Sequence, residues 1–388
     1  IMDVRPSPLS QRLTELRTKV AKLEKSLPTT MVMAEMNPPR KTFVLSRGQY
    51  DQPTEVLVTA GLPAELGALP DNVEPNRLAL SQWLVDSSNP LTARVAVNRY
   101  WQMYFGTGIV TTPEDFGAQG ELPSHPQLLD WLASEFVRSN WNVKAMQKLI
   151  VMSATYQQSS RITPRLLEVD PRNRLLARGP RFRLPAEAIR DNALAVSGLL
   201  VKRLGGESVR PYQPAGLWDD VVYQNVPRFQ QDHGEKLYRR SMYTYWKRSV
   251  PPPNLQAFDA PSREACVLMR SRTNTPMAAL VLMNDPTFVE ASRKLAERAM
   301  TLRDAPSARL TFLFRLTTGR RPMKNELARL HTTWTDLLTD FRQDQEGAKN
   351  LMHIGESDYD ETLDLAELAA YSAIANALLG LDETITKH

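Results

Sequence analysis

The 388-residue sequence contains a single cysteine, Cys266, and only five histidines. One thiol excludes an internal disulfide framework, a four-thiolate zinc site and a covalent haem c site of the Cys-x-x-Cys-His type. It leaves the cellular compartment open, because secreted proteins can also lack disulfides. Cys266 shares a predicted helical face with Met269 and has no histidine nearby in the sequence, so we expect a packed thiol and not a nucleophile.

Long apolar runs and a strong charge excess are also missing. No run of 18 apolar residues is present, so no transmembrane helix is expected. Lys and Arg number 48 against 43 Asp and Glu, and this difference of five gives no indication of nucleic-acid binding. The sequence starts at Ile1 without a signal peptide, and we expect a fragment or a processed product of a longer chain.

Residues 1–75 are expected to form a joint to an upstream domain. Leucine and valine recur at alternating spacings of four and three from Leu9 to Leu27, which predicts a heptad helix over 8–27 with Ser7 as its N-cap. Such a helix is marginal alone, so it needs a partner helix. The partner belongs to the same chain, to an upstream domain or to another subunit. Short extended segments at 31–36, 42–45 and 56–58 predict a small β element.

Residues 76–388 are predicted to form a helical domain, and a subdivision near 155–185 stays open. Periodicity predicts helices over 77–86, 91–105, 126–139, 143–156, 185–200, 275–283, 286–300, 306–317, 324–342 and 361–379. Asn274 or Thr275 is the expected cap of the helix at Pro276. A basic connector covers 157–183, and an irregular insert over 207–260 contains one predicted strand, 238–247. The expected fold is therefore mainly α: a multi-helix globular domain with a small β element near the N-terminus and a short strand in the irregular insert.

The loop 106–124 contains the first candidate site. Its glycines allow the backbone to approach a ligand closely. Asp115 and His125 could converge with Asp130 as a general base or a metal-binding group, although we expect no resident metal. The alternative is structural: Ser124 or His125 caps the helix at Pro126, and Asp115 holds its own loop. His125 and Asp115 are the first two catalytic candidates.

Arginine is concentrated in the segment 161–190, with eight arginines against three acidic residues. Guanidinium groups bind carboxylate, sulfate or phosphate in a bidentate manner, which predicts an anion site. The alternative is an internal ion-pair network, because Glu187, Arg190 and Asp191 share one helical face. The candidate binding residues here are Arg181, Arg183 and Arg190, and Asp191 is the third catalytic candidate.

The segment 238–248 interleaves aromatic and basic side chains. Such a pattern stacks sugar rings or bases, or it anchors a core with arginines reaching outward. Both faces of the predicted strand are mixed, which favours burial with paired arginines. The candidate binding residues are Arg239, Arg240, Trp246 and Arg248.

Several long motifs together resemble one family. They are Asn98-Arg-Tyr-Trp, Phe105-Gly-Thr-Gly, Glu114-Asp-Phe-Gly, Pro123-Ser-His-Pro-Gln-Leu-Leu-Asp-Trp-Leu-Ala, Ser153-Ala-Thr-Tyr-Gln-Gln-Ser-Ser, Arg183-Leu-Pro-Ala-Glu-Ala-Ile-Arg-Asp, Tyr238-Arg-Arg-Ser-Met-Tyr-Thr-Tyr-Trp-Lys-Arg, Phe258-Asp-Ala-Pro and Thr273-Asn-Thr-Pro-Met-Ala-Ala-Leu. From about residue 75 to Leu381-Asp-Glu, the sequence resembles the planctomycete-type domain of unknown function 1553, which is abundant in Planctomycetes and Verrucomicrobia.

The resemblance implies a module of an exported, multidomain planctomycete-type protein in the periplasm or outside the cell. In that family the domain follows another domain of unknown function, often with a cytochrome c domain further upstream. Any haem c would then lie on the upstream domain, and no cofactor is expected in this chain. The family has no established reaction to carry over.

Two functions stay open at this point. The first is a scaffold or binding module that takes anionic polysaccharide through its arginine-rich and Tyr/Trp-rich surfaces. The alternative is a hydrolytic or redox enzyme that works with an upstream cytochrome c domain and uses Asp115, His125 and nearby carboxylates. Nucleic acid is not an expected partner.

Overall fold

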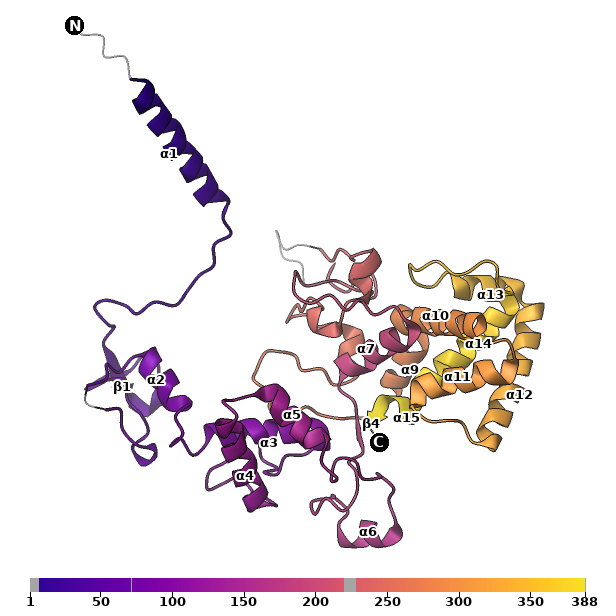
Figure 1. Cartoon of the computed structure of the whole chain (residues 1–388), viewed down its shortest axis with the longest axis horizontal. Helices are drawn as coiled ribbons and strands as arrows, with labels where there is room; N and C mark the ends of the chain where they lie inside the picture. The colour runs from indigo at the N-terminus through magenta and orange to yellow at the C-terminus, as the bar shows by residue number, and fades with distance from the viewer. Residues whose placement is uncertain (1–6, 71, 220–227, 388) are drawn as a thin grey trace. The chain divides into compact units, whose positions relative to one another are not determined.

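The computed structural model describes residues 7–70, 72–219 and 228–387 (Figure 1). The predicted mainly α class with a small N-terminal β element is confirmed, since helices α1 to α15 dominate and the strands form two small antiparallel sheets. The chain divides into two compact units, Ile1–Pro90 (unit 1) and Leu91–His388 (unit 2). No helix in the described ranges is long and apolar enough to cross a lipid bilayer.

Unit 1 contains α1 (Pro8–Ser26), β1 (Thr42–Leu45), β2 (Pro53–Val58) and α2 (Arg77–Leu84). Ser7 caps α1 as predicted, with its side chain accepting from the Ser10 amide. No residue of α1 is buried, and the apolar heptad positions from Leu9 to Leu23 are each at least half exposed. The strand predicted over 31–36 is not formed, whereas β1 and β2 pair as an antiparallel hairpin.

The first part of unit 2 is a small helical cluster. It contains α3 (Thr92–Phe105), α4 (Pro126–Arg138) and α5 (Val143–Val151), and α6 (Pro164–Val169) forms within the predicted connector. The three larger helices share a core that includes Val97, Trp101, Leu132 and Ile150. Gly106 ends α3 with a φ of 80°, a left-handed conformation that glycine adopts without a Cβ clash.

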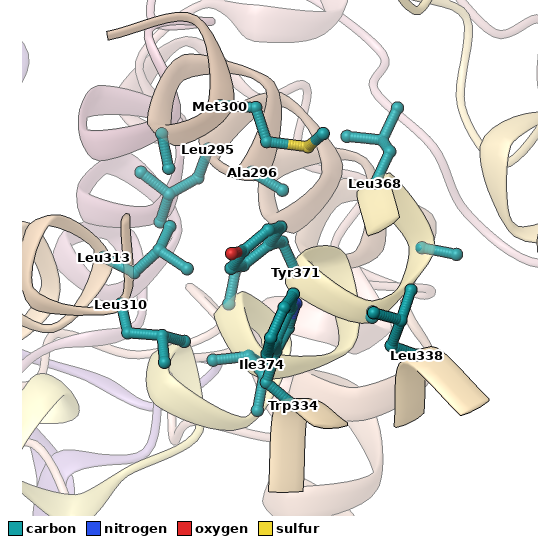
Figure 2. Packing of buried hydrophobic residues seen from close by; sticks show 14 of the residues in the cluster. Leu295, Ala296, Met300, Leu310, Leu313, Trp334, Leu338, Leu368, Tyr371 and Ile374 are labelled. Atoms are coloured by element: carbon teal, nitrogen blue, oxygen red, sulfur yellow. The ribbon is translucent and has the colours of Figure 1, made fainter. Parts of the chain in front are cut away.

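The last part of unit 2 is a helical bundle around α14. The bundle helices are α7 (Ala186–Ser197), α9 (Pro276–Asn284), α10 (Pro286–Leu302), α11 (Pro306–Thr318), α12 (Lys324–Gln343), α13 (Gln345–Met352), α14 (Leu365–Leu379) and α15 (Asp382–Ile385). α14 is apolar on all sides, which is typical of a helix surrounded by others, and α9 to α13 pack against it. Figure 2 shows the centre of this core, where Tyr371 stacks on Trp334 at 5.2 Å between ring centres.

A two-residue strand pair connects distant parts of unit 2. β3 (Phe182–Arg183) pairs antiparallel with β4 (Thr386–Lys387). The Lys387 ammonium group also donates a hydrogen bond to the Tyr104 carbonyl of α3 at 3.1 Å. The end of the described chain is therefore fixed to both β3 and α3.

The strand predicted over 238–247 is not formed. Short 3-10 turns at Gly234–Tyr238 and Ser241–Tyr243 take its place, followed by α8 (Pro253–Gln256). The carbonyls of Leu237 and Arg239 accept hydrogen bonds from the Arg190 side chain and not from a neighbouring strand. The thiol expectation is also wrong: Cys266 lies in a non-helical segment and is exposed.

Candidate functional site

Arg190 and Asp191 hold the fold together and do not form an open site. The Arg190 side chain is 2% exposed, and it donates to the Leu237 carbonyl at 2.6 Å and the Arg239 carbonyl at 3.0 Å. Burial lowers the pKa of Arg190. The Asp191 carboxylate accepts from both the amide and the hydroxyl of Ser241 at 2.7 Å. Both side chains therefore connect α7 to the irregular insert.

The candidates of segment 238–248 are spread between the interior and the surface. Arg239 is 1% exposed, and its guanidinium lies 3.8 Å from the Tyr243 ring centre. Its nitrogens donate to three backbone carbonyls of the loop 203–207. The Trp246 indole donates to the Ser262 carbonyl at 3.0 Å, whereas Arg240 and Arg248 are exposed. The structure does not bring these four residues together around one ligand.

The structure gives Asp115, His125 and Asp130 separate partners. Asp115 accepts from the Gly117 amide at 2.7 Å, and Asp130 pairs with Arg94. The His125 Nδ1 atom lies 3.0 Å from the Ser124 hydroxyl. His125 occupies the predicted N-cap position of α4, but its side chain makes no cap bond. No group of three or more His, Cys, Asp or Glu among the described residues is placed to hold a metal.

A cavity of about 300 Å³ lies where the loop after α3 meets the arginine-rich connector. We call it the arginine cavity. The arginines that line it are Arg172, Arg174, Arg178, Arg181 and Arg272. No acidic side chain is among the described residues of its lining. The remaining lining includes aromatic rings and the hydroxyl groups of Thr107, Thr111 and Ser124. The cavity is therefore both strongly cationic and able to bind hydroxyl groups.

Two of these arginines have carboxylate partners. Arg174 donates to Glu121 at 2.8 Å, and Arg181 forms an ion pair with Asp382. Hydrogen bonds from the Thr111 hydroxyl and then from Arg174 lower the pKa of Glu121. These two pairs neutralise part of the positive charge at the cavity.

The other three guanidinium groups have no carboxylate within ion-pair distance in the described part of the chain. Arg178 is buried and donates to two backbone carbonyls, those of Asp170 and Pro171, at 3.0 and 2.8 Å. Arg272 donates to the Gly106 carbonyl at 3.1 Å, and Arg172 is exposed. Burial, followed by the charge of Arg183, lowers the pKa of Arg272. No carboxylate of the described residues neutralises the charge of these three guanidinium groups, so a bound anion would be favourable here.

The local sequence explains why the carboxylate of Asp170 does not neutralise these three guanidinium groups. The Asp170 carboxylate accepts from the backbone amides of Arg174 and Leu175 at 2.8 and 2.7 Å. The Asn173 side chain donates to the Arg178 carbonyl at 2.8 Å. Short polar side chains therefore hold this turn by local backbone bonds, and the arginines extend from a fixed loop.

A second cavity, of about 430 Å³, lies beside the first. We call it the α3 cavity, because Arg99, Gln102 and Met103 of α3 line one side. Phe182 and Arg272 line both cavities and form the wall between them. Most charges of the α3 cavity are already paired: Arg183 with Asp259, and Arg270 with Glu187 at 2.7 Å.

Of the residues named from the sequence, Arg181 lines the arginine cavity and Arg183 lines the α3 cavity. Sequence reasoning missed Arg172, Arg174, Arg178, Arg272 and Ser124 as lining residues. The signal for the first three was the density of arginine in 161–190. No sequence signal indicated that Arg272 would join them.

The comparisons with known proteins give a family and nothing finer. A family described as "Protein of unknown function (DUF1553)" matches residues 76–334, about two thirds of the chain. This range includes every arginine of the arginine cavity. No curated protein and no solved structure matches the chain. With a match of this extent, the chain belongs to the DUF1553 family.

Proposed function

We propose that unit 2 is a binding module for an acidic saccharide, whose carboxylate or sulfate group enters the arginine cavity. The observation that carries this proposal is the lining of five arginines with no acidic side chain among its described residues. Planar guanidinium groups match the paired oxygens of carboxylate and sulfate. A volume of about 300 Å³ is at the lower end of small-molecule sites and suits one sugar unit, not a whole polymer.

The uncharged lining favours a saccharide over a bare inorganic anion. Phe182 is partly exposed and presents aromatic carbon, which packs on the apolar face of a sugar ring. Thr107 supplies a hydroxyl group for the hydroxyls of a sugar. A small anion would use only the arginines and leave Phe182 and Thr107 without a role.

Calorimetric titration of the full chain tests the proposal. The probes are a κ-carrageenan tetrasaccharide for sulfate, a hyaluronan tetrasaccharide for carboxylate and cellotetraose as the neutral control. We expect at least one acidic probe to bind and cellotetraose not to bind. Removal of one charge-assisted contact by Arg172→Gln or Arg272→Gln should weaken binding about tenfold or more.

Arg165→Gln is the matched control, because Arg165 is an exposed arginine of α6 outside the lining of the arginine cavity. It changes the net charge equally and should leave the affinity unchanged. The proposal is overturned if neither acidic probe binds, if cellotetraose binds equally well, or if Arg165→Gln weakens binding as much as Arg172→Gln. The last result would indicate general attraction to a basic surface.

One observation favours hydrolysis as a second candidate function. The Ser124 hydroxyl lines the arginine cavity and lies 3.0 Å from the His125 Nδ1 atom. A serine beside a histidine is the arrangement of a nucleophile and its general base in ester hydrolysis: the serine oxygen attacks the ester carbonyl, histidine takes its proton and gives it to the leaving sugar hydroxyl, and water then releases the acid. The test is acetate release from an O-acetylated tetrasaccharide of the acidic series that binds. His125→Ala should abolish release while the probe still binds, and an intact probe after prolonged incubation with the unaltered chain would refute this candidate.

The cellular context is a further part of the proposal. We propose an exported multidomain protein, in the periplasm or outside the cell, with any haem c on an upstream cytochrome domain. The support is the resemblance of the long motifs to the planctomycete-type family. The full-length gene tests it, since it should encode a signal peptide and an upstream Cys-x-x-Cys-His motif.

A further inference from the structure

We propose that the α3 cavity is a second sugar subsite, so that the ligand is an extended acidic oligosaccharide that crosses the Phe182–Arg272 wall. The inference rests on the proposed function, because it describes how a saccharide held in the arginine cavity continues. Beyond the proposed function, it specifies that the ligand is longer than one sugar unit and that acidic and neutral units alternate along it.

The wall between the cavities is a pair of side chains. The Arg272 guanidinium carbon lies 4.4 Å from the Phe182 ring centre, and an Arg272 Nη atom is bonded to the Gly106 carbonyl. The close approach depends on glycine at position 106: a Cβ there would lie 2.7 Å from the Phe182 ring and 3.2 Å from the Arg272 nitrogen. A stacked arginine and phenylalanine present a flat surface on which a sugar ring can cross from one cavity to the other.

The α3 cavity differs from the arginine cavity in chemistry. Its lining is largely apolar, from Met103, Leu184, Phe258 and Leu268. The Arg183–Asp259 and Arg270–Glu187 pairs balance their own charges within the lining. Such a surface suits the apolar face of an uncharged ring, with Gln102 and Ser271 available to its hydroxyls.

Besides Arg272 in the wall, one cation of the α3 cavity stays unbalanced. Arg99 is exposed and has no carboxylate within ion-pair distance among the described residues. An acidic group on the next unit of the chain would pair with it. Arg99 lies about two turns of α3 before Gly106, which contacts the wall, so the surfaces follow in the order of a cationic cavity, a stacked wall, an apolar cavity and a cation. This order matches a saccharide in which acidic and neutral units alternate.

The experiment compares ligand lengths. The disaccharide and the tetrasaccharide of κ-carrageenan and of hyaluronan, both alternating series, are titrated into the full chain. In the series that binds, the tetrasaccharide should bind at least tenfold more tightly than the disaccharide. Arg99→Gln and Met103→Ala should each reduce this ratio to about three or less. Arg165→Gln is the control and should leave the ratio unchanged.

The outcomes separate this inference from the proposed function. If both lengths bind equally and Arg172→Gln weakens both, the α3 cavity is not a subsite, although the arginine cavity still binds the acid. If the length gain persists in both α3 variants, the extra units contact another surface and the inference is also overturned. If neither series binds, the proposed function itself fails. Arg99 and Met103 are exposed, so both variants should keep the wild-type melting temperature.

Discussion

Replacing Arg190 by leucine distinguishes a structural arginine from a ligand-binding one. Arg190 is buried, and its guanidinium donates to the carbonyls of Leu237 and Arg239 and to the Ser241 hydroxyl. Leucine keeps the apolar contacts of α7 but removes all three hydrogen bonds. Ser241 retains its bond to Asp191, so two buried carbonyls lose a partner.

The expected cost follows from those two carbonyls. Each buried polar group without a partner costs about 1–3 kcal/mol. Arg190 is itself expensive to bury, as its lowered pKa shows, and leucine removes that cost. We therefore expect Arg190→Leu to destabilise unit 2 by about 2–4 kcal/mol, below the sum of the two losses.

Urea unfolding followed by tryptophan fluorescence measures this loss. Amide hydrogen exchange should also accelerate over residues 237–244, because Arg190 holds the 3-10 turns there. Arg172→Gln should give the opposite pattern, with weaker binding of the acidic probe and an unchanged unfolding midpoint. An Arg190→Leu variant that keeps normal stability but no longer binds the acidic probe would refute the reasoning, because Arg190 would then be a ligand-binding residue.

The remaining predictions concern one ion pair and two glycines. The hydrogen bond from Arg320 lowers the pKa of Glu326 from 4.5 to about 2. A depressed carboxyl pKa adds stability that is present above pH 4.5 and lost as the pH falls towards 2. Between pH 4.5 and 2, the melting temperature of the wild type should therefore fall more steeply than that of Glu326→Gln. Equal slopes would contradict this. Gly355 has a φ of 91°, and a Cβ there would lie 2.3 Å from the Glu290 carboxyl carbon, whereas Gly319 has a φ of 79° and open space. Thermal melting should show a large loss of stability for Gly355→Ala, whereas Gly319→Ala should lose only about 1–2 kcal/mol from backbone strain. Similar losses of stability in the two variants would refute the steric argument.

The helices were predictable where local signals agree. Ser7 and Thr275 cap their helices as the sequence indicates, each followed by proline at the first helical position. Periodicity predicts the helix that contains α14, and the apolar sequence of α14 explains why most of this helix is buried. These features depend on residues within one or two turns, so the sequence pattern contains them.

The insert was not predictable in the same way. The alternation of tyrosine and arginine over 238–247 satisfies the pattern of a strand. The Leu237 and Arg239 carbonyls are bonded to Arg190, about 50 residues away in the sequence, and isolated bridges, among them those to Val201 and Val209, form in place of a continuous ladder. Hydrogen bonds from a distant side chain leave no local periodicity, so the pattern favoured the wrong element.

The segments of the candidate site were predictable, but their arrangement around one cavity was not. The glycine-rich loop and the arginine-rich segment were each recognised, but nothing in the sequence shows that they face one cavity. Glu187 and Arg190 lie three residues apart and were expected to share a helix-face network, yet Glu187 pairs with Arg270 and Arg190 with backbone carbonyls. A fully buried guanidinium needs several acceptors around its plane, and only the tertiary fold supplies them.

The β3–β4 pair has a consequence for when the cavities become structured during synthesis of the chain. Lys387 contacts Tyr104 across 283 residues of sequence and lies beside Phe182 in the wall of both cavities. A ribosome completes α3 and the arginine segment long before residue 387 emerges, and closing so long a loop is a late, entropically costly step. We therefore expect the wall of the two cavities to reach its final form only once β4 has paired with β3. Affinity for the acidic ligand should consequently arise only after β4 has paired with β3.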